Sequence, residues 1–143
     1  GLPEGPALFR RPLTGWLPAP GPLDYCYQRP GLKEVDLGFA GRKPPSSPIH
    51  QAITRLQVGD PLLYVANERG FRLEDVGGIT VGRFSQHFSP LEGSCIDARV
   101  RAILVWRKSD SAPEYQARCK CERWEVVLPE LVFSPDPAAG EGI

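Results

Sequence analysis

The sequence of 143 residues lacks several features that would assign it at once to a class of protein. It has only four cysteines and two histidines, too few for a dense disulfide scaffold or a histidine-rich metal centre. No apolar run approaches the length of a membrane-spanning helix, and residues 1–13 lack the apolar core of a signal peptide. We therefore expect a cytoplasmic protein that has no membrane partner.

An excess of charge of either sign is also lacking, because 17 Lys and Arg residues balance 17 Asp and Glu residues. This balance excludes a histone-like protein that binds nucleic acid by overall charge alone, but it allows a local basic face. Methionine is missing even at position 1. We therefore expect either a fragment of a longer protein or a chain whose first residues have been trimmed.

Motifs of known enzyme classes are missing as well. Neither a nucleophile elbow nor a G-x-x-x-x-G-K-[ST] phosphate loop occurs, and the aspartates lie singly along the chain. We expect no enzyme, no cofactor and no small-molecule substrate. Cys119 and Cys121 are one residue closer than the common zinc spacing, and their potential co-ligands lie far away in the sequence. Partly buried thiols are therefore favoured for Cys26, Cys95, Cys119 and Cys121, with zinc as the alternative.

What the chain does have is proline and glycine, 16 and 15 residues respectively. Residues 1–31 are rich in both, which predicts an arm or a linker because proline lacks the backbone donor of helices and central strands. Residues 32–135 are expected to form one domain, and residues 136–143 a disordered tail.

Hydrophobic periodicity predicts the elements of this domain. Residues 32–42 alternate as in a strand, with Val35, Leu37 and Phe39 on one face. Apolar residues at helical spacing then predict a helix that begins at Ser47, as its cap, and ends near 58–59.

Alternation with period two dominates the rest of the chain. It predicts strands at 62–66, 71–76, 79–84, 96–106 and 123–133, with Pro129 at an edge or a bulge and a helical turn at 113–118 that Ser111 caps. The predicted fold is therefore mainly β. Short strands joined by hairpins favour a small, partly closed antiparallel barrel, OB-like or SH3-like, with one covering helix.

Local charge is the most informative functional pattern. Residues 98–123 contain seven basic and three acidic residues, and Arg99, Arg101 and Arg107 share one predicted strand face, next to Lys108. Such a stripe suits the phosphates of nucleic acid, although a solvated outer face explains it equally well. Residues expected to extend the stripe or to stack on bases are Arg83, Arg42, Trp106 and Trp124.

Three stretches carry a resemblance to a known family. EVDLGFAGRKPPSSPIHQAITRLQVGDPLLY, FRLEDVGGITVGRFSQHFSP and CERWEVVLPELVF resemble the C-terminal accessory region of bacterial RecQ-type ATP-dependent DNA helicases. The segment GGITVGRF is similar, less closely, to the HIRAN module, a small barrel that binds single-stranded DNA ends, but that module's Asn/Asp-rich stretch is missing here. The resemblance implies a dependent helicase domain in the bacterial cytosol, without motor motifs of its own.

Two hypotheses of function follow. The first is a non-catalytic accessory domain that binds the backbone of single-stranded or junction DNA through the basic strand face. The alternative is a docking module that packs on the helicase motor domains or on a partner without contacting nucleic acid. Apolar residues on both faces of the strand at 62–66 favour the alternative.

Overall fold

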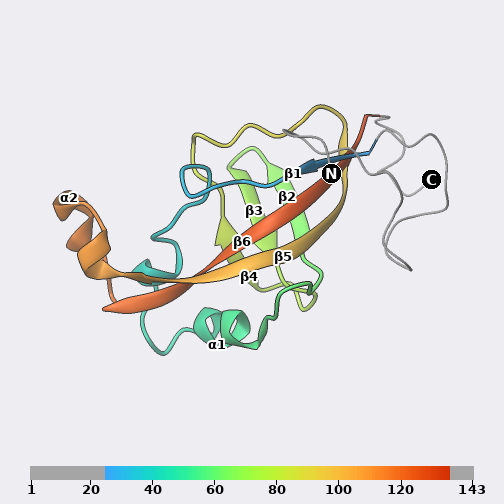
Figure 1. The fold of residues 1–143 in the computed structure, drawn as a ribbon. Coiled ribbons are helices and arrows are strands. Elements are labelled where there is room, and N and C mark those ends of the chain that lie inside the picture. Colours follow the sequence, from blue (N-terminus) through green and yellow to red (C-terminus); the bar gives the residue numbers. More distant parts are fainter. Residues whose placement is uncertain (1–24, 136–143) are drawn as a thin grey trace, which may run out of the picture.

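Two small antiparallel sheets form the framework of the protein, in a computed structural model that describes residues 25–135 (Figure 1). The first sheet has the strand order β1-β6-β5 and the second has the order β2-β3-β4. The predicted mainly β class is confirmed. The bounds are Cys26–Gln28 for β1, Leu63–Asn67 for β2, Gly70–Glu74 for β3, Thr80–Arg83 for β4, Ser94–Arg107 for β5 and Arg123–Ser134 for β6.

The two sheets do not close into the OB-like or SH3-like barrel that the strand pattern predicts. In the described part of the chain, isolated bridges join Pro61 to Arg99 and Val35 to Phe84. Strands β2 to β4 have only four or five residues each and pair with one another. They reach β5 through the segment before β2, where Leu62 N donates to Ala98 O. The long strands β5 and β6 form a two-stranded ribbon within the first sheet, and this sheet stays distinct from the sheet β2-β3-β4.

The β5–β6 ribbon contains the bulge that Pro129 predicts. The pairing register shifts between Val100, which lies opposite Pro129, and Ala102, which lies opposite Leu128. Arg101 is therefore the extra residue of β5 at this point. A bulge suits the site because proline has no N–H to donate to a neighbouring strand. After Arg101, the β5 residues pair with β6 one position out of the regular register, so their side chains face the opposite side from the one that uninterrupted alternation predicts.

One helix covers the sheets, as predicted. Helix α1 spans Pro48–Arg55, and the Ser47 side chain accepts a hydrogen bond from Ile49 N at its start. It contacts β6 and β4 and buries Ala52 and Ile53 (Figure 1). The helix ends three residues before the predicted stop, because Leu56 already has an extended backbone.

The strand predicted at residues 32–42 is wrong. This segment forms turns followed by a short 3₁₀ helix, η1, at Ala40–Arg42. The cause is Asp36, whose carboxylate accepts hydrogen bonds from Gly38 N and from the Arg42 guanidinium and so favours a turn over an extended chain. Val35 and Phe39 are nevertheless buried, as their alternation predicts.

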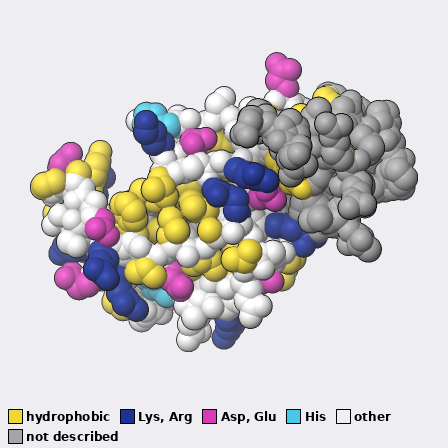
Figure 2. Space-filling view, viewed as in Figure 1, with side chains coloured by type: hydrophobic (Ala, Val, Ile, Leu, Met, Phe, Trp, Pro, Cys, Tyr) yellow, Lys and Arg dark blue, Asp and Glu magenta, His cyan; other side chains and the backbone are white. Residues whose placement is uncertain are grey.

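The segments at both ends of the ribbon match the prediction in part, and the helical turn predicted at 113–118 is confirmed over Pro113–Gln116. Strand β1 pairs with β6 and Pro30 is buried, so the folded domain begins before residue 32. At the other end, η2 (Lys108–Asp110) and α2 (Pro113–Gln116) connect β5 to β6, and the start of α2 carries no side-chain cap from Ser111. Hydrophobic side chains gather beside α2 on the face shown in Figure 2. Residues 1–24 of the predicted arm or linker (1–31) and the whole predicted tail, 136–143, lie outside the described residues.

Aromatic side chains fill the space between the two sheets. Tyr64 on β2 contacts Phe71, Phe84, Phe88 and Phe133, with ring centroids 5.9 to 6.4 Å apart. Its neighbour Leu62 is buried, whereas Leu63 is 47% exposed. The described residues contain no helix long and apolar enough to cross a membrane.

Candidate nucleic-acid interface

The arginines of β5 are held by partners within the chain. The Arg99 guanidinium donates to the Gly59 carbonyl at 3.0 Å and lies 3.4 Å from the Asp97 carboxylate, which stands just outside the basic stretch 98–123. The Arg101 guanidinium donates to Pro30 O at 2.8 Å and, more weakly, to Pro129 O at 3.4 Å. Both side chains therefore connect elements of the fold.

The predicted single row of arginines on β5 is wrong. In the ribbon, Arg99 lies opposite Glu130 and Arg107 lies opposite Arg123. Residues 123 and 130 are seven positions apart on β6 and face opposite sides, because side chains alternate along a strand. Arg99 and Arg107 consequently face opposite sides too, and the extra residue at the Arg101 bulge is the physical cause.

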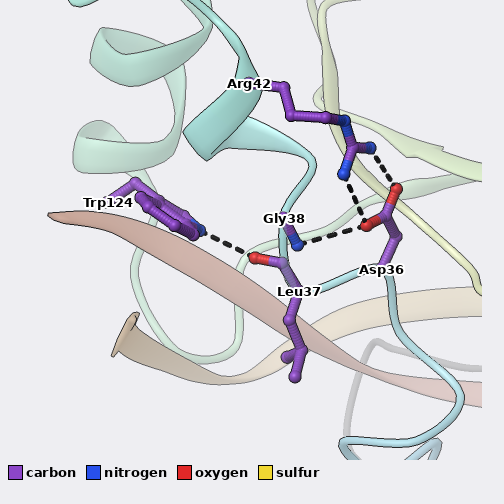
Figure 3. A network of polar contacts seen from close by, with 5 residues as sticks. All are labelled: Asp36, Leu37, Gly38, Arg42 and Trp124. Atoms are coloured by element: carbon purple, nitrogen blue, oxygen red, sulfur yellow. Dashed lines mark hydrogen bonds and ion pairs between the residues drawn. The ribbon is translucent and has the colours of Figure 1, made fainter. Parts of the chain in front are cut away.

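Trp124 is not an exposed stacking surface. Its side chain is 4% exposed, and its indole N–H donates to the Leu37 carbonyl at 2.7 Å (Figure 3). A Cβ at Gly41 would lie 2.5 Å from the indole ring, so only glycine allows η1 to approach this closely. Trp124 is thus a core residue that fixes the segment from Leu37 to Gly41 on β6.

The other predicted residues do not form one continuous basic stripe. Arg42 forms an ion pair with Asp36 beside the Trp124 contact (Figure 3). Lys108 Nζ lies 3.8 Å from a Glu122 carboxylate oxygen, and Arg107 is exposed. Trp106 is half-buried and Arg83 is exposed on β4. Arg83 lines one hollow of the surface and Arg42 and Trp106 line another, whereas Arg107 and Lys108 line neither.

The first hollow, the basic concavity, has a volume of about 360 Å³. Four cationic side chains line it, and no described Asp or Glu does. The cations come from the end of η1, the β2–β3 turn and strands β3 and β4; they are Lys43, Arg69, Arg72 and Arg83. A concave surface with cations of one sign focuses a positive potential, which attracts phosphate groups.

Local structure fixes each cation of the basic concavity. Arg72 and Arg83 are directly opposite one another in the β3–β4 register, and Glu74 binds Arg72 at 3.0 Å. Lys43 Nζ lies 5.4 Å from the centroid of the Phe39 ring, a cation–π contact. Arg69 sits in the β2–β3 turn, where Asn67 Oδ1 accepts its backbone N–H.

The β2–β3 turn itself depends on glycine. Gly70 has a φ of +115°, which other residues rarely adopt. The turn therefore holds Arg69 at the edge of the basic concavity. Glu68, the other residue of the turn, does not line it.

The second hollow, the aromatic groove, has a volume of about 410 Å³ and separates α2 from the segment 35–42. Trp106 and Tyr115 contribute aromatic rings, and Leu37 and Ala112 contribute apolar surface. Two arginines also line the groove, Arg42 and Arg118, together with Asp36 and Asp110.

Sequence reasoning missed three of the four cations of the basic concavity, namely Lys43, Arg69 and Arg72. The sequence does contain one pattern from which the position of Arg72 could have been predicted. The strands at 71–76 and 79–84 flank the turn at Gly77-Gly78, and that hairpin brings Arg72 close to Arg83. No comparable local pattern connects Lys43 or Arg69 to them.

Cysteines and histidines do not assemble into a metal centre in the described part of the chain, where no three potential ligands converge. Cys121 Sγ lies 3.6 Å from His50 Nε2 and 3.3 Å from Lys43 O. Burial raises the pKa of the Cys121 thiol, with a smaller contribution from Cys119. The pair is thus a structural contact between α1 and the segment before β6.

The chain was compared with models of protein families, with curated proteins and with solved structures, and none of them matches it.

Proposed function

We propose that this chain is a non-catalytic, nucleic-acid-binding domain whose basic concavity holds the phosphate backbone of single-stranded or junction DNA. The single observation that carries this proposal is the lining of the concavity, which has four cations and no described carboxylate. The resemblance to helicase accessory regions supports DNA in the bacterial cytoplasm as the partner, with the helicase motor domains in the same polypeptide.

The direct opposition of Arg72 and Arg83 supports an anionic ligand. Like charges opposite one another in a sheet destabilise it by up to about 1 kcal/mol. Glu74 offsets the charge of Arg72, and Arg83 is left facing the hollow. A bound phosphate between the two strands would relieve this repulsion.

Binding of a fluorescent single-stranded oligonucleotide, measured by anisotropy at several salt concentrations, tests the proposal. We expect a dissociation constant of about 10⁻⁴ to 10⁻⁶ M that weakens with salt, because phosphate contacts release counterions. The double variant Arg69→Glu/Arg83→Glu should bind at least about tenfold more weakly, since two contacts become repulsive.

A matched control is the double variant Arg55→Glu/Arg123→Glu, which changes the net charge equally at exposed positions outside the concavity. It should bind within about twofold of the original protein. Equal losses in both variants would show that overall charge, and not the concavity, governs binding. A protein that shows no binding at low salt would contradict the proposal outright.

A second candidate function, docking on another protein surface, has one observation in its favour. Val76 is 75% exposed and Ile79 is 38% exposed. With Leu56 and Pro61 they line a cleft of about 420 Å³ between α1 and the β3–β4 turn. Exposed apolar residues gathered in this way are typical of protein contacts. This cleft is distinct from the basic concavity, so the helicase motor domains can contact it while DNA is bound.

A further inference from the structure

The aromatic groove differs from the basic concavity in its charge. Arg42 and Arg118 are matched by Asp36 and Asp110, so the groove has no formal net charge. The Asp36 carboxylate binds Arg42, and Asp110 accepts a hydrogen bond from the backbone N–H of Arg107 at 3.1 Å. A phosphate group gains little from such a balanced lining, whereas an uncharged, flat ligand avoids the cost of burying a charge of its own there.

Aromatic surface is what the groove offers to such a ligand. Tyr115 on α2 is 58% exposed, and Trp106 lies at the end of β5. Hydrogen bonds from Tyr115 N to Ala112 O and from Arg118 N to Tyr115 O close the short helix that carries Tyr115. The two rings therefore come from two elements, α2 and the end of β5, and both line the groove.

Two stretches of chain run from the lining of one hollow to the lining of the other. Arg42 lines the aromatic groove and Lys43 lines the basic concavity, and consecutive Cα atoms are about 3.8 Å apart. A second connection runs from Arg83 in the concavity to Ser85 in the groove, at most about 7 Å along the chain. These short connections are the basis for considering one nucleic-acid strand as the ligand of both hollows.

We propose that the aromatic groove stacks an unpaired base of the same strand whose backbone the basic concavity holds. The inference rests on the proposed function and names the form of the ligand, which is single-stranded rather than duplex DNA. Stacking on aromatic rings is tolerant of sequence because every base has a π-face. The domain should accordingly recognise the presence of a base and show little preference among the four bases.

An oligonucleotide of thymidines and an abasic oligonucleotide of equal length provide the test, because they carry the same phosphates. The original protein should bind the thymidine strand about tenfold more tightly than the abasic strand. Tyr115→Ala and Trp106→Leu should reduce that preference to within about twofold and leave the affinity for the abasic strand unchanged. Tyr115→Phe retains the ring and should keep the preference.

The outcomes separate this inference from the proposed function. Equal binding of both strands by the original protein would overturn base stacking in the groove, while the salt-dependent binding in the concavity would stand. The same holds if Tyr115→Ala keeps the full preference. Absence of binding to either strand would overturn both proposals. Circular dichroism of Tyr115→Ala establishes whether the variant is folded, and at this exposed position we expect the fold to be unchanged.

Discussion

Strand β5 and the β3–β4 hairpin both present arginines, and the two sets differ in what surrounds them. On β5, the guanidinium groups of Arg99 and Arg101 bind three backbone carbonyls and a carboxylate. On the hairpin, Arg83 stands opposite Arg72 and faces a hollow without a described acidic lining residue. The first set serves the fold, and the second, in which Glu74 pairs with Arg72 but not with Arg83, is the set that we propose binds a ligand.

This difference shows that the number of cations in a stretch of sequence does not tell how many of them can contact an external ligand. A guanidinium group has five N–H donors in a fixed fork, so a single arginine can join several carbonyls from different elements. Arg101 does this between the β1 segment and the β6 strand, at Pro30 and Pro129. The arginines of β5 have the clearest charge pattern in the sequence, yet they are less available to a ligand than Arg83 on the β3–β4 hairpin.

The largest effect that separates the two sets is expected for Arg101→Ala. The substitution removes the donors for Pro30 O and Pro129 O, so the free energy of unfolding should fall by about 2 kcal/mol. Arg107→Ala, at an exposed position of the same strand, should change it by less than about 0.5 kcal/mol. Urea denaturation followed by fluorescence measures both values. Equal values would mean that Arg101 contributes no more to the fold than a surface residue.

For Arg83→Gln we expect a smaller effect, which changes the binding of DNA and not the stability of the fold. Because Arg83 faces Arg72 and lies in the hollow, the free energy of unfolding should stay within about 0.5 kcal/mol or rise slightly. The slope of log affinity against log salt for single-stranded DNA should fall by about 0.7, the value for one phosphate contact. Arg107→Gln is the matched control for the slope. An unchanged slope in Arg83→Gln would remove Arg83 from the interface.

The sequence predicts those parts of this fold that depend on neighbouring residues. Ser47 and Pro48 start a helix, and Gly77-Gly78 turns a hairpin, because capping and positive φ are local requirements. The strands predicted at 96–106 and 123–133 also follow from two long alternating runs, and they form β5 and β6. The predicted strand at 32–42 failed because its alternation is equally compatible with turns, and Asp36 decides between them through its side-chain hydrogen bonds.

The candidate site was predicted less completely, for a different reason. Alternation continues unbroken through Arg101, and the bulge is signalled only by Pro129 on the partner strand. The sequence pattern thus predicts one face for Arg99 and Arg107 where the ribbon has two. Lys43, Arg69 and Arg72 come from separate elements, and only the tertiary packing brings them to Arg83. The resemblance to helicase accessory regions remains a prediction.

The smallest effect concerns Asp97, the carboxylate partner of Arg99. Burial raises the pKa of Asp97 above its ordinary value, although Arg99 and the Ala98 N–H act in the opposite direction. The folded state thus holds this proton more tightly than the unfolded state does. Its contribution to stability is complete below the ordinary pKa near 3.8 and is lost as the pH rises through the raised pKa.

Asp97→Asn stays uncharged at every pH, so it keeps this contribution. The free energy of unfolding of the variant should match that of the original protein near pH 3 and exceed it slightly at pH 7. Urea denaturation across this pH range measures the difference, with Glu92→Gln on the exposed loop before β5 as the control. A variant that is instead less stable at pH 7 would show that the Asp97–Arg99 ion pair outweighs the cost of burying the carboxylate. Arg99 would then be held even more firmly within the fold, which would sharpen its contrast with Arg83.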